Sequence, residues 1–372
     1  MTNNPLDAVP VLPAAEKHSR EKRLFQGIPS FTISPGGRFF CSWYGGDKGE
    51  GPQNYVTVAI SDDKGATWRE GAAVIDPPGE NVRAFDSAMW TDPLGRVHIF
   101  WAQAFSLETW KSETDGVNGV WDSYLDEPDA KELRWSPSRR IADGIMLNKP
   151  VLAQDGSWMY PVSIWGDGVA GGASVPEWNK PYVGANLFTS SDQGRTLRRK
   201  GICRFEMNIY DEHHFVPLRD GRLWCLARTQ YGIGQGFSKD GGRTWEDVGP
   251  SPIPGPNSRF FVRRLNSGRL LLVNHKLPLS DKPGWRERDK LSAFLSDDDG
   301  RTWSDGLLID ERAKVSYPDA CQDADGRIWC VYDRDRLGDV EILLVGVTED
   351  EILAGGALPK ERRIVISHLD PH

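Results

Sequence analysis

Short apolar runs separated by turn-forming residues extend along most of the chain, a pattern typical of β-strands joined by hairpins. Six of the turns carry a glycine just before an apolar run, which is a hairpin signal. They are Gly37, Gly95, Gly156, Gly221, Gly268 and Gly326. Successive glycines are 47 to 65 residues apart, so each interval holds a four-stranded sheet with its loops. We therefore predict an all-β fold: a six-bladed β-propeller of four-stranded antiparallel blades, forming a single domain over 23–372.

A second repeat, Ser-x-Asp-x-Gly-x-Thr-Trp, supports the same architecture. It occurs at 61–68, 238–245 and 296–303, and at 190–197 with Leu in place of Trp. Repeats several dozen residues apart indicate equal supersecondary units. The Asp and Gly suit a tight turn, the Ser and Thr can hydrogen-bond the local backbone, and the Trp can pack between strands. A structural role is favoured over calcium binding, because Asp62-Asp63 and Asp297-Asp298-Asp299 lack the spaced ligands of a calcium loop.

Three segments fall outside the repeats. Residues 1–22 are expected to form a loose N-terminal tail. A capping box of Thr348 and Glu351, followed by Gly355, predicts a short surface helix. Residues 110–145 are polar and are expected to be the longest loop region, a candidate rim for a binding site.

Composition and charge exclude several functions. The net charge of −8, with both signs interspersed, argues against nucleic acid as a partner. No apolar run approaches transmembrane length, and the first 30 residues contain no signal-peptide core. The five cysteines show no metal-type spacing and mostly lie in apolar runs, so buried free thiols are expected. We expect a cytoplasmic protein with no metal, no cofactor and no membrane partner.

The first strand of each blade faces the central channel of a propeller, and here it precedes the turn glycine. Nine residues before the six glycines stand Ile28, Asp86, Leu147, Glu212, Arg259 and Tyr317. Four of these six are polar, although strand starts near a surface are often polar by chance. The alternative is a convergent polar site at one mouth of the channel, and this is the interpretation that we follow.

The eight-residue repeat is the Asp-box of sialidases, and the chain resembles the sialidase (neuraminidase) superfamily over nearly its full length. That family carries a Glu followed 16 residues later by an Arg at a strand end, and Glu212 and Arg228 have this spacing. Arg288, before a late Asp-box, and Tyr317, before the last hairpin, match two further family residues. The joint spacing carries the resemblance, since each residue alone has an ordinary structural explanation.

The resemblance also indicates an acid/base carboxylate about eleven residues before the first box. Glu50 occupies that position, although the family normally has Asp there, and Asp47 is the nearby alternative.

One departure from the family pattern concerns the substrate. The family begins with Phe/Tyr-Arg-Ile-Pro, whose Arg joins two others on the sugar carboxylate, whereas this chain has Gly27 in that place, after Gln26. A guanidinium holds a carboxylate through two parallel hydrogen bonds, which neither Gly nor Gln can replace. Arg259 or Arg83 could restore a third cation from another direction. We expect both arginines, together with Asp86, Gln26 and His213, to belong to the substrate site.

The resemblance implies an exo-glycosidase that releases a terminal acidic sugar, either sialic acid or a related 2-keto-3-deoxy acid. Tyr317 would attack the anomeric carbon while Glu212 takes its proton. Glu50 would protonate the leaving oxygen and later activate water, giving retention. Arg228 and Arg288 would hold the acid group and lower the Tyr pKa.

Two other functions remain open. A lyase on uronic-acid polysaccharides would use a Tyr or a His as the base, and His213 or His214 would serve. The third possibility is a non-catalytic carbohydrate-binding propeller, although pure binding does not require a Tyr–Glu couple. The two adjacent His residues point to opposite faces of a strand, which disfavours a shared metal ion.

Overall fold

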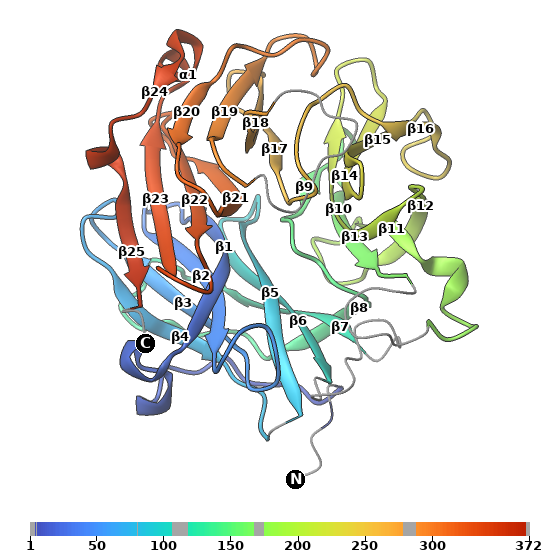
Figure 1. Cartoon of the computed structure of the whole chain (residues 1–372). Helices are drawn as coiled ribbons and strands as arrows, with labels where there is room; N and C mark the ends of the chain where they lie inside the picture. The colour runs from blue at the N-terminus through green and yellow to red at the C-terminus, as the bar shows by residue number, and fades with distance from the viewer. Residues whose placement is uncertain are drawn as a thin grey trace.

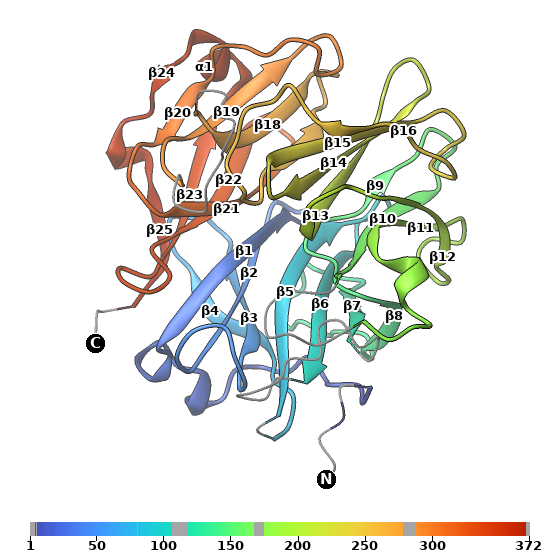
Figure 2. The ribbon, with the colours of Figure 1, turned by 45° about the vertical axis from the view of Figure 1, so that its right-hand side comes forward.

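The chain folds into a ring of six sheets (Figure 1), so the six-bladed propeller is confirmed. The computed structural model describes residues 4, 6–79, 81–105, 118–166, 175–277 and 288–369. The sheets follow one another around the ring in chain order, from the blue first sheet to the red last one (Figures 1 and 2). Within each sheet, consecutive strands pair antiparallel, as expected for blades that are built from hairpins.

The strands of the first three blades lie between residues 25 and 203. Blade one comprises β1 (Phe25–Ile33), β2 (Phe39–Gly46), β3 (Tyr55–Ser61) and β4 (Arg69–Ile75). Blade two comprises β5 (Val82–Thr91), β6 (Val97–Phe105), β7 (Gly119–Leu125) and β8 (Arg139–Asp143). Blade three comprises β9 (Val151–Leu152), β10 (Trp158–Ile164), β11 (Gly184–Ser190) and β12 (Arg198–Cys203).

The strands of the last three blades lie between residues 208 and 368. Blade four comprises β13 (Asn208–Pro217), β14 (Leu223–Thr229), β15 (Gly232–Ser238) and β16 (Glu246–Pro250). Blade five comprises β17 (Phe261–Arg264), β18 (Leu270–His275), β19 (Leu291–Ser296) and β20 (Leu307–Asp310), with the short β24 (Gly356–Ala357) paired parallel to β20. Blade six comprises β21 (Val315–Gln322), β22 (Ile328–Arg334), β23 (Glu341–Val347) and β25 (Ile364–His368).

This strand order gives the propeller two chemically different faces. The turns between first and second strands, and those between third and fourth strands, lie on one face, which we call the hairpin face. The first strands begin on the opposite face, where the connections between second and third strands also lie. We call this second face the pocket face, because the cavity described below opens there.

All six turn glycines lie between the first and second strands of a blade, as predicted, and each has φ between 80° and 90°. In each turn the glycine N–H donates to the carbonyl three residues earlier, as Gly37 does to Ser34 at 3.0 Å and Gly326 to Asp323 at 3.1 Å. Glycine is favoured here because a Cβ is disfavoured at this positive φ.

The four Asp-boxes form self-contained turns between third and fourth strands. In the first box the Thr67 hydroxyl donates to Asp63 at 2.6 Å, the Thr67 N–H donates at 2.8 Å, and the Ser61 hydroxyl donates at 2.8 Å. The Gly65 N–H donates to the Ser61 hydroxyl at 2.9 Å, and the same four bonds recur in the other three boxes. Trp68 packs against Phe39 within blade one. The predicted structural role of the box therefore agrees with its hydrogen bonds.

Buried carboxylates join the last blade to the first. Asp319 accepts the Ser30 hydroxyl at 2.5 Å and the Phe31 N–H at 2.8 Å, and Asp333 accepts the Ile28 N–H at 2.8 Å. Lys149 of blade three forms an ion pair with Asp319 at 3.0 Å. Because each blade is made of its own strands, these side-chain contacts help to close the ring in place of a shared strand.

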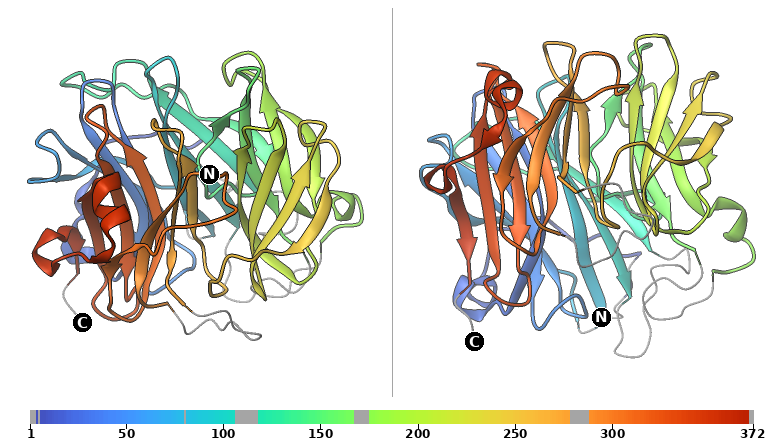
Figure 3. Two further views of the ribbon diagram at one scale, coloured as in Figure 1. Left: turned by 90° about the horizontal axis from the view of Figure 1, so that it is seen from above. Right: turned by 45° about the horizontal axis from the view of Figure 1, so that its top comes forward.

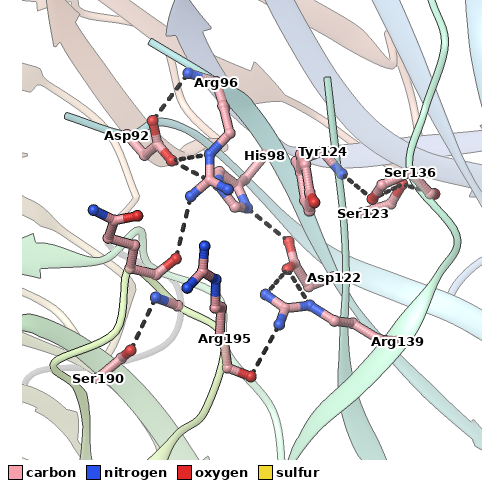
Figure 4. Close-up of polar contacts among 12 residues, drawn as sticks. Asp92, Arg96, His98, Asp122, Ser123, Tyr124, Ser136, Arg139, Ser190 and Arg195 are labelled. Atoms are coloured by element: carbon pink, nitrogen blue, oxygen red, sulfur yellow. Dashed lines mark hydrogen bonds and ion pairs between the residues drawn. The ribbon is translucent and has the colours of Figure 1, made fainter. Parts of the chain in front are cut away.

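Blades two and three are joined on the hairpin face by a buried charged network (Figure 4). The ring nitrogens of His98 lie 2.9 Å from Asp122 and 3.2 Å from Asp92. Arg139 donates two hydrogen bonds to Asp122, at 2.6 and 3.0 Å, and one to the carbonyl of Arg195 in the blade-three Asp-box at 3.2 Å. Both carboxylates are therefore satisfied by protein partners.

The remaining segments pack against this ring. The N-terminal segment is tied to blade one rather than loose, since Leu12 exchanges two backbone hydrogen bonds with Val74. The 3₁₀ turns are Glu16–His18, Arg20–Lys22, Lys180–Tyr182 and Lys360–Arg362. The predicted helix is α1 (Glu349–Ala354), capped by Thr348 and ended by Gly355, beside β19 and β20 at the edge of blade five (Figure 3).

One predicted loop is wrong in its described part. Residues 119–143 contain β7 and β8, which form the outer half of blade two, while residues 110–117 lie outside the described residues. Polar residues dominate this stretch because an outer strand such as β8 is only partly covered.

All five cysteines lie in the described part of the chain and are free thiols, four of them buried. In the described segments no helix is long and apolar enough to span a membrane.

Candidate active site

A cavity of about 800 Å³ opens on the pocket face. Its lining includes Ile28, Asp86, Glu212 and Tyr317, which are four of the six residues that stand nine positions before a turn glycine. The other two, Leu147 and Arg259, do not line it. The structure thus brings polar residues from blades two, four and six to one place near the start of the inner strands.

The same backbone feature positions all four residues. Ile28, Asp86, Glu212 and Tyr317 have left-handed φ values of 59°, 46°, 42° and 52°. Each lies at a register shift between the first and second strands of its blade. A β-bulge re-aims a side chain and increases the local twist, and a non-glycine residue in this conformation costs about 1–2 kcal/mol. Strain of this kind, repeated at one cavity, motivates a functional hypothesis.

Tyr317, Glu212 and Arg228 form a closed hydrogen-bonded triangle at the base of the cavity. The Tyr317 hydroxyl donates to Glu212 Oε1 at 3.1 Å, and Arg228 Nη1 donates to the same oxygen at 2.9 Å and to the Tyr317 hydroxyl at 3.1 Å. Arg228 lies on β14 and is fixed from behind by Asn257, whose Oδ1 accepts its Nε at 2.7 Å. The second oxygen of Glu212, Oε2, is buried and has no hydrogen-bond partner among the described residues.

The charges around Tyr317 act in opposite directions on its hydroxyl. Burial raises the pKa of Tyr317 to about 12, and the Glu212 carboxylate adds to this rise. The guanidinium groups of Arg228, Arg288 and Arg336 act to lower it. Tyr317 is therefore protonated in the free protein, and its hydroxyl already donates to Glu212, the group that could accept its proton.

Arg288 and Arg336 flank the Tyr317 ring, with their Cζ atoms 5.5 and 4.7 Å from its centroid. Arg288 lies in the connection before β19, as its match to the sialidase pattern places it, and its Nη2 donates to the carbonyl of Asn257 at 3.4 Å. Arg336 lies in the connection between β22 and β23, and the sequence reasoning missed it. The available signal was topological, since Glu50 and Arg288 also lie in connections between second and third strands.

Glu50 is the acid/base candidate that reaches the cavity. It lies in the connection between β2 and β3, lines the cavity, and accepts Arg336 Nη1 at 2.6 Å. Asp47, the alternative in the same loop, is exposed and lines a separate depression with His18 and Tyr55, so the structure does not bring it to the site.

Asp86 and Arg83 reach the cavity from the inner strand of blade two, as expected. Burial raises the pKa of the Asp86 carboxyl to about 8, against the opposing charge of Arg83. Asp86 is therefore largely protonated at neutral pH. Arg83 lies over the Phe85 ring, its Cζ 3.8 Å from the centroid.

Three residues expected at the site lie elsewhere. The Gln26 amide bonds to the carbonyl of Val340 at 3.0 Å and accepts a bond from Ser367 at 3.1 Å, so it joins blade one to blade six. The Arg259 guanidinium is buried and donates to Asn148 at 2.8 Å and to the carbonyl of Leu147 at 3.2 Å, so it holds blade three instead of restoring a third cation.

His213 is the third of these residues. Its ring lies between Ser163 and the carbonyl of Asn186, at 3.3 and 3.1 Å, and burial lowers its pKa to about 3. Its neighbour His214 is equally buried, lies 3.0 Å from the carbonyl of Phe260, and has a pKa lowered by burial to about 3. Neither ring lines the cavity, because both turn into the contacts between blades.

The fold, its Asp-box turns and the cavity together define a sialidase-fold β-propeller. The sequence model of the BNR repeat-like domain matches residues 37–330, and the chain belongs to this family. A search of curated proteins finds no match.

Solved structures of sialidases share the fold at low sequence identity. The Hadza microbial sialidase Hz136 superimposes with a TM-score of 0.69 and 16% identity, over 88% of this chain and 66% of its own. The intramolecular trans-sialidase of Ruminococcus gnavus, in complex with oseltamivir carboxylate, superimposes with a TM-score of 0.63 and 12% identity, over 92% of this chain and 98% of its own. A protein of unknown function from Dyadobacter fermentans superimposes with a TM-score of 0.64 and 15% identity, over 90% of this chain and 97% of its own. Similarity at this level establishes the fold alone.

Proposed function

We propose that the protein is an exo-glycoside hydrolase that releases a terminal acidic sugar, sialic acid or a related 2-keto-3-deoxy acid, with retention of configuration. The observation that carries this proposal is the triangle of Tyr317, Glu212 and Arg228 inside a cavity with three further arginines. A protonated Tyr that donates to a buried carboxylate is a nucleophile paired with its base.

The first step forms a bond between the Tyr317 oxygen and the anomeric carbon. The Tyr317 proton passes to Glu212, which already accepts its hydrogen bond. The bond from the anomeric carbon to the leaving oxygen breaks, and that oxygen takes a proton from the Glu50 carboxyl. In the second step water, deprotonated by Glu50, attacks the anomeric carbon, the bond from that carbon to the Tyr317 oxygen breaks, and the Tyr317 oxygen recovers its proton from Glu212. Two inversions at one carbon give net retention.

The acid group of the substrate explains why the nucleophile is a tyrosine. An anomeric carbon that bears a carboxylate would repel a carboxylate nucleophile, whereas a neutral hydroxyl approaches without that repulsion. Arg228, Arg288 and Arg336 supply positive charge around Tyr317, which favours both the acid substrate and the developing phenolate. Trp165 and Tyr210 add an aromatic wall on which the apolar face of a sugar can pack.

The lyase alternative loses its histidine base, because both rings are buried between blades and stay neutral. A tyrosine base would still serve a lyase, so the products decide between the two reactions. The binding-only alternative predicts affinity without turnover.

The test is a panel of fluorogenic glycosides of sialic acid and of 2-keto-3-deoxy acids, read by fluorescence and by proton NMR of the released sugar. We expect release of at least one acid sugar with its anomeric configuration retained, and no release from the matching neutral hexosides. Release with inversion, an unsaturated product, or no turnover of any acid glycoside would contradict the proposal.

A further inference from the structure

Gly27 lies inside β1, where glycine is unfavourable, and the conformation of its backbone does not require glycine. It is absent from the residues with positive φ, so conformational freedom does not explain it. The space above Gly27 explains the glycine. A Cβ at this position would overlap the Cδ of Arg336, lie 2.7 Å from its Cγ, and lie 3.1 Å from Asp333 Oδ2. The side chain of Arg336 thus crosses the strand where position 27 has no side chain.

Arg336 is held in this place by two carboxylates of different kinds. Asp333 is fully buried and is fixed by the Ser316 hydroxyl at 2.6 Å and the Ile28 N–H at 2.8 Å. It lies 3.6 Å from Arg336 Nε and so anchors the base of the guanidinium. Glu50, at the rim, bonds Nη1 at 2.6 Å, and its side chain is 44% exposed. Asp333 belongs to the contacts that close the ring, whereas Glu50 belongs to a surface loop.

We infer that the Arg336 guanidinium binds the acid group of the substrate. The lack of a side chain at Gly27 leaves room for Arg336, which comes from the last blade, and Glu50 holds the guanidinium until the substrate binds. This inference rests on the proposed function, since it assigns a specificity-determining residue to that reaction. A planar guanidinium that already holds one carboxylate presents the geometry that a second would use. Its position beside the ring of Tyr317, whose hydroxyl accepts a hydrogen bond from Arg228, places that acid group next to the reacting carbon.

The exchange has a consequence for Glu50. In the free protein the Glu50 carboxylate is paired with the Arg336 guanidinium. When the substrate carboxylate takes Arg336, the Glu50 carboxyl leaves this ion pair and can turn to the leaving oxygen. Glu50 is therefore a competitor of the substrate acid before binding and a proton donor after it.

The spatial part of the inference is tested without any ligand, by thermal unfolding of Gly27→Ala in two backgrounds. In the wild type the added methyl expels Arg336, so the midpoint should fall by several degrees. In the Arg336→Gly background the main obstacle is gone, and the fall should be less than half as large. Equal falls in both backgrounds would overturn the claim that Gly27 serves Arg336.

The receptor role is tested by calorimetric binding of 2-deoxy-2,3-didehydro-N-acetylneuraminic acid and of its methyl ester. For Arg336→Ala we expect the acid to bind roughly 10- to 100-fold more weakly, with little change for the ester. For Glu50→Gln we expect the acid to bind several-fold more tightly, because its competitor is removed. Arg334→Ala is the matched control, since Arg334 ends β22 just before the loop that carries Arg336, but pairs with Asp339 and Glu341 outside the cavity.

The outcomes separate the two claims. Hydrolysis of acid glycosides with acid binding unchanged in Arg336→Ala would overturn the receptor role and leave the proposed function intact. A wild type that binds neither probe and hydrolyses no acid glycoside would overturn the proposed function and the receptor role together, while the unfolding result would still decide why position 27 is glycine.

Discussion

The two faces of the propeller treat the same residue type in opposite ways. On the hairpin face, Asp63 accepts the Thr67 hydroxyl and further local donors, which lower its pKa to about 2. On the pocket face, Asp86 is buried in a left-handed bulge, and burial raises its pKa to about 8. Asp63 is ionised because local hydrogen-bond donors of its turn stabilise the carboxylate. Asp86 is held neutral because burial penalises its charged form.

Repetition explains the difference. The hairpin face uses the same satisfied turn four times, so the loss of one copy leaves the others intact. The pocket face uses a strained bulge in four inner strands but places a different side chain in each. The first arrangement specifies the fold, and the second leaves one set of positions free to carry chemistry. Changes on the two faces should therefore separate stability from activity.

The largest expected effect is on the pocket face, in Tyr317→Phe. Removing the hydroxyl removes the nucleophile but leaves the ring that Arg288 and Arg336 flank. Turnover of an acid glycoside should fall by about 10³-fold or more, and the thermal midpoint should stay within a few degrees. Initial rates and differential scanning calorimetry measure both quantities. Surviving activity would show that Tyr317 is not the nucleophile.

The next effect belongs to the hairpin face, in His98→Gln. This change breaks a buried charge network and should lower the free energy of unfolding by about 3–5 kcal/mol, with the activity per folded molecule unchanged. Denaturant titration and active-site-normalised rates measure the two effects. A loss of activity that exceeds the loss of folded protein would contradict the separation of the faces.

The same network gives a pH dependence. Burial alone would lower the pKa of His98, but Asp122 and Asp92 outweigh it and raise that pKa. A raised folded-state value means that the stabilisation is fully present below the unfolded value of about 6.5 and is lost as pH rises through the folded value. His98→Gln should therefore destabilise more at pH 6 than at pH 9. An equal loss at both pH values would show that the charge of His98 contributes nothing.

A smaller effect, which depends on pH, is expected on the pocket face in Asp86→Asn. The Asp86 carboxyl has a pKa of about 8, so it ionises in the wild-type cavity as pH rises through that value and repels an acid substrate. The rate on an acid glycoside should fall above pH 8 in the wild type, and this alkaline fall should be absent in the variant. Activity lost at every pH would instead assign the proton donation to Asp86 rather than Glu50.

The smallest expected effect is in Asp63→Ala, on the hairpin face. The variant loses three hydrogen bonds of one box, so the midpoint should fall by a few degrees at pH 7 with no change in activity. Since the pKa of Asp63 is lowered, its contribution is present above about 3.8 and is lost as pH falls towards 2. Asp62→Ala is the matched control, because Asp62 forms only an exposed ion pair with Arg38 among the contacts of the described residues. Equal effects of the two variants would remove the special role of the box.

The sequence predicted the features that repeat. Turn glycines and Asp-boxes depend on local backbone geometry, so Gly37 and Ser61 could be placed from their neighbours alone. Tyr317, Glu212 and Arg228 could be placed because their spacing resembles that of a known family. The blade count followed from local signals, and it is the blade count that brings distant inner strands to one axis.

The residues that were missed depend on packing between blades. Arg336 lies in a loop, and its place in the cavity depends on the neighbouring Asp333, and on Glu50 and the room left by Gly27, which are both far away in the sequence. Gln26 is next to Gly27, yet its amide bonds to blade six, since the pairing of β1 with β2 shifts just after these residues. Arg259 stands nine residues before a turn glycine, as the site residues do, but its inner strand, β17, begins only at Phe261 and shows no register shift.

The central claim is that Tyr317 becomes bonded to the sugar during turnover. A 2,3-difluorinated acid sugar slows the second step, so a bonded intermediate accumulates and can be located by peptide mass spectrometry. We predict one sugar adduct on the peptide that contains Tyr317, absent from Tyr317→Phe and reduced in Glu212→Gln. An adduct on Glu50, Asp86 or any other residue, or steady turnover with no adduct at all, would contradict this account.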